Sequence, residues 1–243
     1  MPTPDYFADL PARYEHLRTT LPPALAEQLA QYGCAPFASD PDTTLRPGRL
    51  YVCSLKPYGA AGRTYPNGWD ERPDRTGYHR WYDSSSATGN FVREADALLR
   101  STLATMGIAD ADPRHVFNTY AYPWRAEDSR QLKAYGLDRL GIGDLHRRWL
   151  NVVRPEVVLC IGNGPAPSAF VTMCAAAGLS PKHVTTVTPG PRLKVRHGLI
   201  GGGPLVIGVP HLSRVRAGQV WGAVEEILTQ QQQQQQQQQA LGG

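Results

Sequence analysis

The apolar residues of the chain gather in four short runs, separated by stretches in which apolar residues recur at helical spacing. Short apolar runs indicate buried strands, and recurrence at three and four residues indicates helices. The predicted strands cover residues 49–55, 115–122, 157–161 and 205–209. The predicted helices cover residues 91–106, 143–153, 166–177 and 217–228. This alternation predicts a three-layer α/β/α fold around a central four-stranded parallel sheet.

Proline-rich and polar segments divide the 243 residues into three predicted parts. Residues 1–48 form an N-terminal helical extension and loop packed on the core, with Pro22 and Pro23 interrupting the helix. Residues 49–229 form the α/β domain, which includes a long connection over 60–90 and an irregular β segment over 183–200. Residues 230–243 carry an uninterrupted glutamine run, which predicts a disordered tail or a frayed helix.

Three polar signatures follow the apolar runs: Ser54-Leu55-Lys56-Pro57-Tyr58-Gly59, a segment ending in Asn118, and Pro210-His211-Leu212-Ser213. Ligands of open α/β sheets bind outside the carboxyl ends of the strands. We therefore expect these three segments to meet at one edge of the sheet and to form one site, although they lie far apart in the sequence.

The order and type of these signatures resemble the uracil-DNA glycosylase superfamily. Pro57 and Tyr58 match the family's first motif, Gly-x-Asp/Asn-Pro-Tyr/Gly, whereas Ser54 replaces its glycine. Lys56 stands where the family places the acid or amide that positions the attacking water. The resemblance covers about residues 49–228. It implies a glycosylase-like fold and an enzyme that flips a nucleotide out of DNA and hydrolyses its N-glycosidic bond, leaving an abasic site.

The Lys56 substitution leaves several roles open. An ammonium group does not stabilise an oxocarbenium-like sugar as a carboxylate does. Lys56 contacts a DNA phosphate, acts as an amine nucleophile that forms a Schiff base with the sugar C1, hydrogen-bonds an unusual base, or is simply solvated. Asp74 or Asp83 in the long connection would then supply the missing carboxylate.

The resemblance also implies a base pocket. Asn118 would read the pyrimidine edge, because an amide offers both a donor and an acceptor. Tyr58 would wall off the pyrimidine C5 position, which predicts that thymine is a poor substrate. An aromatic residue of the long connection would stack on the flipped base. The expected pocket residues are Leu55, Pro57, Tyr58, Tyr78, Trp81 and Tyr82.

The third signature resembles the family's His-Pro-Ser loop, with Leu212 in place of the proline. The resemblance implies that His211 hydrogen-bonds the pyrimidine O2, where negative charge develops in the transition state. His211, Lys56 and Asn118 are thus the expected catalytic residues. Ser213 would hold a phosphate, and Arg214 or Val215 would enter the space left by the flipped nucleotide. The expected DNA-binding residues are Ser54, Asn163, Ser213, Arg214, Val215 and Arg216.

Charge and cysteine content limit the kinds of binding partner and cofactor that we expect. The net charge is +4, and no Asp or Glu occurs between Glu156 and Glu225, which suits a polyanion such as DNA. The four cysteines form no C-x-x-C pair, so we expect reduced buried thiols and neither a metal nor another cofactor. With no signal peptide and no apolar stretch of about 18 residues, a cytoplasmic monomer that does not enter a membrane is expected.

The unusual pocket favours a DNA glycosylase that acts on a modified or damaged pyrimidine rather than on plain uracil. A hypermodified cytosine of phage DNA, removed in antiviral defence, would fit. The alternatives are a uracil-DNA glycosylase of base-excision repair and a non-catalytic binder of altered DNA. A hydrolase of free nucleosides is disfavoured, because a small ligand does not need so much positive surface.

Overall fold

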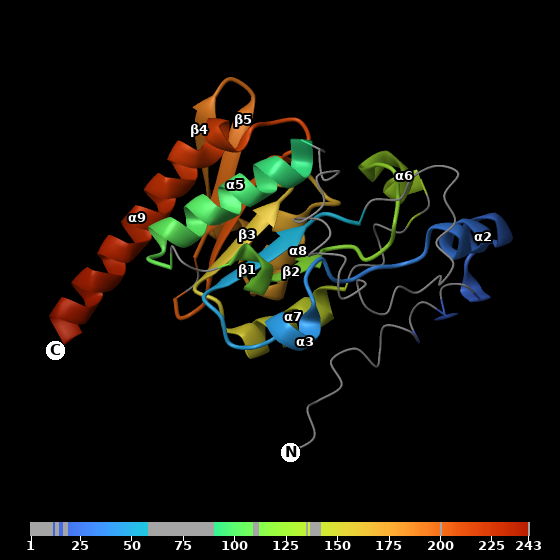
Figure 1. The fold of residues 1–243 in the computed structure, drawn as a ribbon, viewed down its shortest axis with the longest axis horizontal. Helices are drawn as coiled ribbons and strands as arrows, with labels where there is room; N and C mark the ends of the chain where they lie inside the picture. Colours follow the sequence, from blue (N-terminus) through green and yellow to red (C-terminus); the bar gives the residue numbers. More distant parts are fainter. Residues whose placement is uncertain are drawn as a thin grey trace, which may run out of the picture.

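The computed structural model of the chain describes residues 19–57, 90–108, 112–134, 142–199 and 201–242, with a few isolated positions outside these ranges. Within them, six strands form one sheet in the order β2-β1-β3-β6-β5-β4 (Figure 1). The chain is therefore α/β, as predicted.

Four strands make up the parallel part of this sheet. They are β1 (Leu50–Ser54), β2 (Phe117–Tyr120), β3 (Val157–Ile161) and β6 (Leu205–Val209). Every residue of β1, β3 and β6 is buried, as expected for strands that are covered on both faces. All four lie within the apolar runs of the sequence, and the predicted bounds of β3 and β6 agree with the structure.

The sheet is larger and less regular than the predicted four-stranded parallel one. β4 (Val184–Gly190) and β5 (Leu193–Gly198) form a hairpin that joins the sheet through antiparallel pairing of β5 with β6. The sheet is therefore mixed. Segment 183–200 reads as irregular in the sequence because it is rich in polar residues and prolines, and most of the hairpin indeed lies at the surface.

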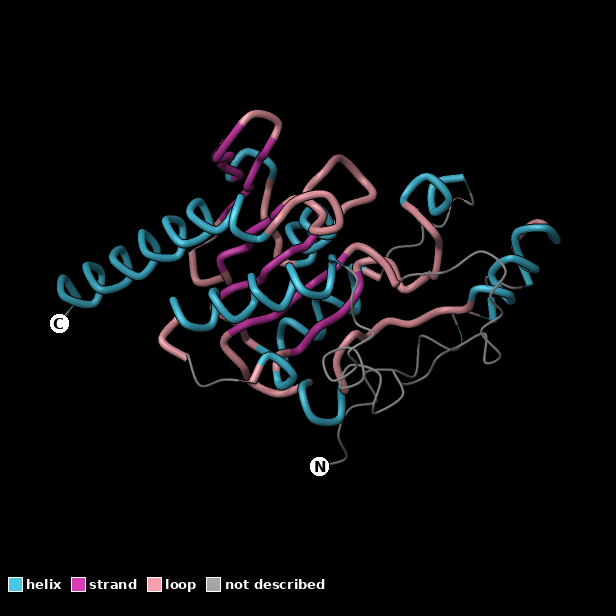
Figure 2. The backbone as a smooth tube through the Cα atoms, turned by 45° about the horizontal axis from the view of Figure 1, so that its top comes forward, coloured by secondary structure: helices cyan, strands magenta, loops and turns pink. Residues whose placement is uncertain are grey.

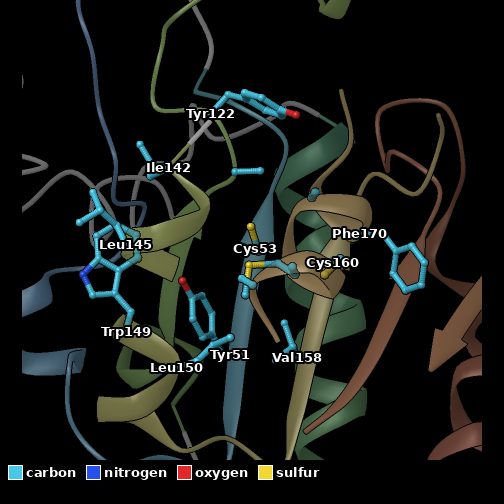
Figure 3. Packing of buried hydrophobic residues seen from close by; sticks show 14 of the residues in the cluster. Tyr51, Cys53, Tyr122, Ile142, Leu145, Trp149, Leu150, Val158, Cys160 and Phe170 are labelled. Atoms are coloured by element: carbon cyan, nitrogen blue, oxygen red, sulfur yellow. The ribbon is translucent and has the colours of Figure 1, made fainter. Parts of the chain in front are cut away.

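Two helical layers cover the sheet (Figures 1 and 2). On one face, α5 (Asn90–Thr105) and α9 (Ala217–Gly242) bury leucines and valines against Val52, Leu159 and Ile207. On the other face, α7 (Gly143–Val153) and α8 (Ala169–Ala176) pack on Tyr51, Val158 and Cys160 (Figure 3). Burial of this apolar surface is the main stabilising contribution.

The face under α7 also holds a small polar network. The Tyr51 hydroxyl lies 2.8 Å from His146 Nδ1 and accepts a hydrogen bond from Thr119 Oγ1 at 3.0 Å. All three residues are fully buried. Burial lowers the pKa of His146 to about 4, so the ring is neutral in the folded protein at ordinary pH.

The N-terminal part packs along the edge strand β2. α2 (Pro23–Tyr32) and the short α3 (Pro41–Thr44) flank a stretch that forms isolated bridges from Cys34 to Trp124 and from Phe37 to Thr119. This stretch covers the free edge of the sheet at β2, where unpaired backbone groups would otherwise be exposed.

Short helices also occur in the described part of the chain: α6 (Ser129–Ala134) and the 3₁₀ turns η1 (Pro113–His115) and η3 (Pro181–His183). At the C-terminus, α9 continues as a helix through the glutamine run to Gly242. Gln232 Nε2 donates to the Thr105 carbonyl at 2.9 Å, which ties the first part of the run to the end of α5. Beyond it the helix extends away from the sheet (Figure 1).

Candidate functional site

The carboxyl ends of the parallel strands lie at one level. Ser54 is in register with Tyr120 on one side and with Ile161 on the other, and Ile161 is in register with Val209. The first and third signatures leave the sheet immediately after this level. They therefore emerge at the same edge, from strands that only β3 separates.

The second signature differs from its prediction. Asn118 is the second residue of β2 and pairs with Val52, two positions before the strand ends at Tyr120. Asn118 lies inside the predicted strand 115–122, but the expectation that the strand ends in this asparagine is wrong, because the pairing with β1 continues through Tyr120. Side chains alternate along a strand, so Asn118 lies on the same face of the sheet as Val52, the face that α5 and α9 cover.

Asn118 is nevertheless an unusual residue. It is 7% exposed, and its backbone is fixed by Ser39, whose Oγ accepts from the Asn118 N–H at 2.9 Å. Its side-chain Oδ1 is buried without a hydrogen-bond partner among the described residues. A buried acceptor without a partner costs about 1–3 kcal/mol, so the position suits a donor supplied by a ligand.

His211 begins the loop that follows β6. The Ser213 backbone N–H points to His211 Nδ1 at 3.3 Å, and Ser213 Oγ lies 2.8 Å from the same nitrogen. Nδ1 is therefore an acceptor, and the neutral ring carries its proton on Nε2. The ring stacks on Phe91 in the first turn of α5, with centroids 5.0 Å apart. His211 thus presents a fixed N–H donor.

Packing also keeps His211 neutral. His211 as a whole residue is exposed, but partial burial of its ring, and then the charges of Lys56 and Arg214, lower the pKa of His211 to about 4. Lys56 belongs to the first signature, so its charge acts on the third signature across the shared edge of the sheet.

Lys56 is held in place. Its Nζ donates to the carbonyl oxygens of Ala126 and Pro57, and the residue is half-buried. Burial lowers the pKa of Lys56 to about 8, although the nearby carboxylates of Asp128 and Glu127 act in the opposite direction. The reading of Lys56 as a freely solvated side chain is therefore wrong. A phosphate contact, a nucleophilic amine and a base contact stay open.

The sequence analysis missed the two carboxylates beside Lys56. Asp128 directly precedes α6 and accepts from the backbone N–H groups of Gln131 and Arg130, which lowers its pKa. Glu127 is exposed, and within the described residues its carboxylate has no hydrogen-bond partner. Only the tertiary contact between Lys56 and Ala126 brings them to the site, so no local signal in the sequence marks them.

The rest of the His211 loop divides into anchors and exposed cations. Leu212 is buried in the core, and Val215 packs against it. Arg214 and Arg216 are exposed. Arg214 and Val215 are the two residues expected to fill the space of a flipped nucleotide. Arg214 is the better placed of the two, because the Val215 side chain packs against the core.

The loop after β3 has a structural role that its sequence did not indicate. The amide NH2 of Asn163 donates to the carbonyls of Lys194 on β5 and Gly208 on β6, so its side chain ties these strands together. A phosphate could meet only the backbone here. Ser54 is likewise 6% exposed and presents little surface to a phosphate, whereas Pro57 is buried and Leu55 half-buried beside this loop.

Several expected residues lie outside the described part of the chain. They are Tyr58, Tyr78, Trp81, Tyr82, Asp74 and Asp83. All four cysteines are buried free thiols, as expected. No group of three or more possible metal ligands occurs among the described residues. None of the helices that the structure describes is both long and apolar enough to span a membrane.

Comparison with known proteins finds neither a protein-family model nor a curated protein that matches the chain.

Proposed function

We propose that this protein is a DNA glycosylase that removes a modified or damaged pyrimidine. The observation that carries the proposal is that the segments of His211 and Lys56 leave the sheet at the same carboxyl edge. There the neutral ring carries its proton on Nε2, and the charge of the fixed Lys56 acts on it through space. Such a donor suits a reaction in which negative charge develops on the leaving group.

The chemistry follows from these groups. When the N-glycosidic bond breaks, its electron pair leaves with the base, and charge develops on the pyrimidine O2. The His211 Nε2–H donates to that oxygen, and the Lys56 cation lowers the energy of the anion through space. Water then bonds to the sugar C1, and its proton passes to a nearby carboxylate. Glu127 is the candidate because its charge acts on Lys56.

Asn118 supplies the second part of the proposal. Its unpartnered Oδ1 would accept a hydrogen bond from an N–H donor of the base. This bond would remove the free-energy cost of the unpaired buried acceptor, but only while the base is bound. An exocyclic amine on a cytosine-type base, or the ring N–H of a uracil-type base, offers that donor. The amide thus favours a pyrimidine edge without deciding between these two.

Lys56 favours a modified base over plain uracil. A cation replaces the acid or amide that positions water in the family this chain resembles, so the group nearest the attacking water differs from that family's. A hypermodified cytosine of phage DNA, excised in antiviral defence, is the substrate we put first.

A single assay tests the proposal. Wild-type protein is incubated with duplex and single-stranded DNA that contains uracil, mismatched thymine, 5-hydroxymethylcytosine or its glucosylated forms, and the free base is measured. His211→Ala removes the proposed donor and should slow release by about 10²–10³-fold. His183→Ala, which changes an exposed histidine of η3, is the matched control and should release base at the wild-type rate.

A non-catalytic binder of altered DNA is the second candidate, and the Lys56 cation is the observation that favours it. Tight binding of one modified DNA without release of any base would support the binder and overturn the glycosylase. Release of one base that is lost in His211→Ala supports the glycosylase and names its substrate.

A further inference from the structure

The β4–β5 hairpin brings a second group of cations to the edge where the site lies. β5 runs antiparallel to β6, with Arg196 opposite Gly208. Continuing this register places the turn at Pro191 and Arg192 about three residues beyond Val209, roughly 10 Å past the end of β6. The turn therefore reaches the level of the His211 loop. Figures 1 and 2 show it projecting from the body of the molecule.

The end of the hairpin near the site is basic. Arg192 and Lys194 are exposed, and Arg196 is half-buried. No acidic residue occurs from 157 to 224, so none lies on the hairpin or on the loops that follow β3 and β6. Lys182, by contrast, belongs to η3 before β4 and lies at the opposite end of the hairpin, because Val184 pairs with Gly198 and Gly198 with Val206.

Asn163 holds the basic end of the hairpin in position. The pairing of β5 with β6 extends only from Arg196 to Gly198. Beyond it, the Asn163 side chain donates to both Lys194 O and Gly208 O and so bridges the two strands. Asn163 comes directly after β3, between the first and third signatures. The hairpin and the candidate site therefore share one rigid support.

The conformation of Arg192 costs stability. Its φ is +66°, in the left-handed region that favours glycine. The two-residue turn that joins β4 to β5 would be more stable with glycine at this position, by about 1 kcal/mol. A cation at a strained and exposed turn is expected where the side chain has a function outside the fold.

We infer that Arg192 and Lys194 bind phosphates of the DNA strand whose base enters the His211 site. This inference rests on the proposed function, and it adds a second contact surface on the far side of the Asn163 loop. Both side chains are exposed cations at the level of the site, and the same sheet fixes them relative to Lys56 and His211.

The sheet order gives the spacing of this contact. Three inter-strand spacings separate β1, which carries Lys56, from β5, and they add up to about 14 Å. A DNA strand rises 3.4 Å per nucleotide along its axis, so the hairpin should meet phosphates about four nucleotides from the flipped one.

Salt-dependent binding tests the contact. Arg192→Gln/Lys194→Gln should lower the slope of log K against log salt by about 0.9 for each lost phosphate on duplex DNA, and affinity at 0.1 M salt by about eightfold for each. Lys182→Gln, with Arg192 and Lys194 intact, should keep the wild-type slope. Neutral methylphosphonates about four nucleotides from the target base, tried on each side, should remove the effect of the double variant.

Arg192→Gly separates binding from folding. It should unfold at a higher temperature than wild type and still bind DNA about eightfold more weakly at 0.1 M salt. A purely structural arginine would not produce opposite changes.

The outcomes distinguish this inference from the proposed function. Suppose that the wild-type protein releases base and its DNA binding depends steeply on salt. If the double variant then has the same salt slope as Lys182→Gln, the hairpin contact is overturned and the glycosylase proposal stands. A wild-type protein without salt-dependent DNA binding overturns both.

Discussion

The two halves of the sheet differ in what they contribute. β1, β3 and β6 are apolar, buried on both faces and parallel, and their loops carry Lys56 and His211. The β4–β5 hairpin is antiparallel, largely exposed and basic. The parallel half therefore supplies rigidity, and the hairpin supplies charge at little cost to the core. Substitutions in the two halves should accordingly separate stability from DNA binding.

A pair of glycines gives the largest contrast. A Cβ on Gly208 of β6 would lie 2.5 Å from Phe170 Cδ2 and 2.9 Å from Phe170 Cβ, so Gly208→Ala should lower the free energy of unfolding by about 3 kcal/mol. Gly190→Ala in β4 would meet nothing closer than 3.7 Å and should change stability by less than about 0.5 kcal/mol. Urea unfolding measures both. Equal losses would show that the hairpin is as tightly packed as the core.

The buried His146 should make the parallel half sensitive to acid. Its pKa is about 4 when folded and about 6.5 when unfolded, so between these values the unfolded chain binds a proton that the folded chain does not. This contribution to stability is complete above pH 6.5 and decreases by about 3 kcal/mol as the pH falls to 4. Urea unfolding from pH 7 to 4 should show a steeper decline for wild type than for His146→Gln. If the stability of the two proteins decreased equally between pH 7 and 4, the proposed contribution of His146 would be contradicted.

Asn163 is the expected link between the two halves. Asn163→Asp replaces both amide donors by a carboxylate that faces two carbonyl oxygens, and should destabilise the fold by about 1–3 kcal/mol. Amide hydrogen exchange should rise at β5 more than at β1. A uniform rise across the sheet would show that Asn163 does not hold the hairpin in particular.

Lys56→Met should give the smallest effect, confined to the site. Loss of the cation removes one cause of the low pKa of His211, so that pKa should rise above 4 without reaching its ordinary value, because burial of the ring remains. Lys182→Met, with a distant lysine changed, should leave it unaltered. NMR titration of the ring measures it, and an unchanged pKa would contradict the proximity of Lys56.

The sequence predicted the parallel half well and the hairpin poorly. Uninterrupted apolar runs such as 157–161 and 205–209 are strong local signals, and their strands form as expected. The hairpin carries Pro189, Gly190 and Pro191 among polar residues, which hide its pairing. Its strands depend on contacts with β6 and α9 that no local pattern encodes.

The site was predictable only where it depends on the order of the strands. The topology brings the segments of Lys56 and His211 to one edge, as the order of strands and signatures indicated. The stacking of Phe91 on His211, the proximity of Glu127 and the position of Asn118 within β2 depend on register and tertiary packing. A single sequence does not specify these.

The pH dependence of base release, measured in single turnover on the substrate panel, tests the central claim most directly. A neutral His211 donor and a cationic Lys56 predict a plateau between about pH 4 and 8. Release should slow above the plateau as Lys56 loses its proton, and below it because protonation of His211 Nδ1 breaks the contact with the Ser213 N–H that holds the ring in position. A rate that increases through pH 8 would instead make Lys56 an amine nucleophile. No release from any DNA at any pH would contradict the account.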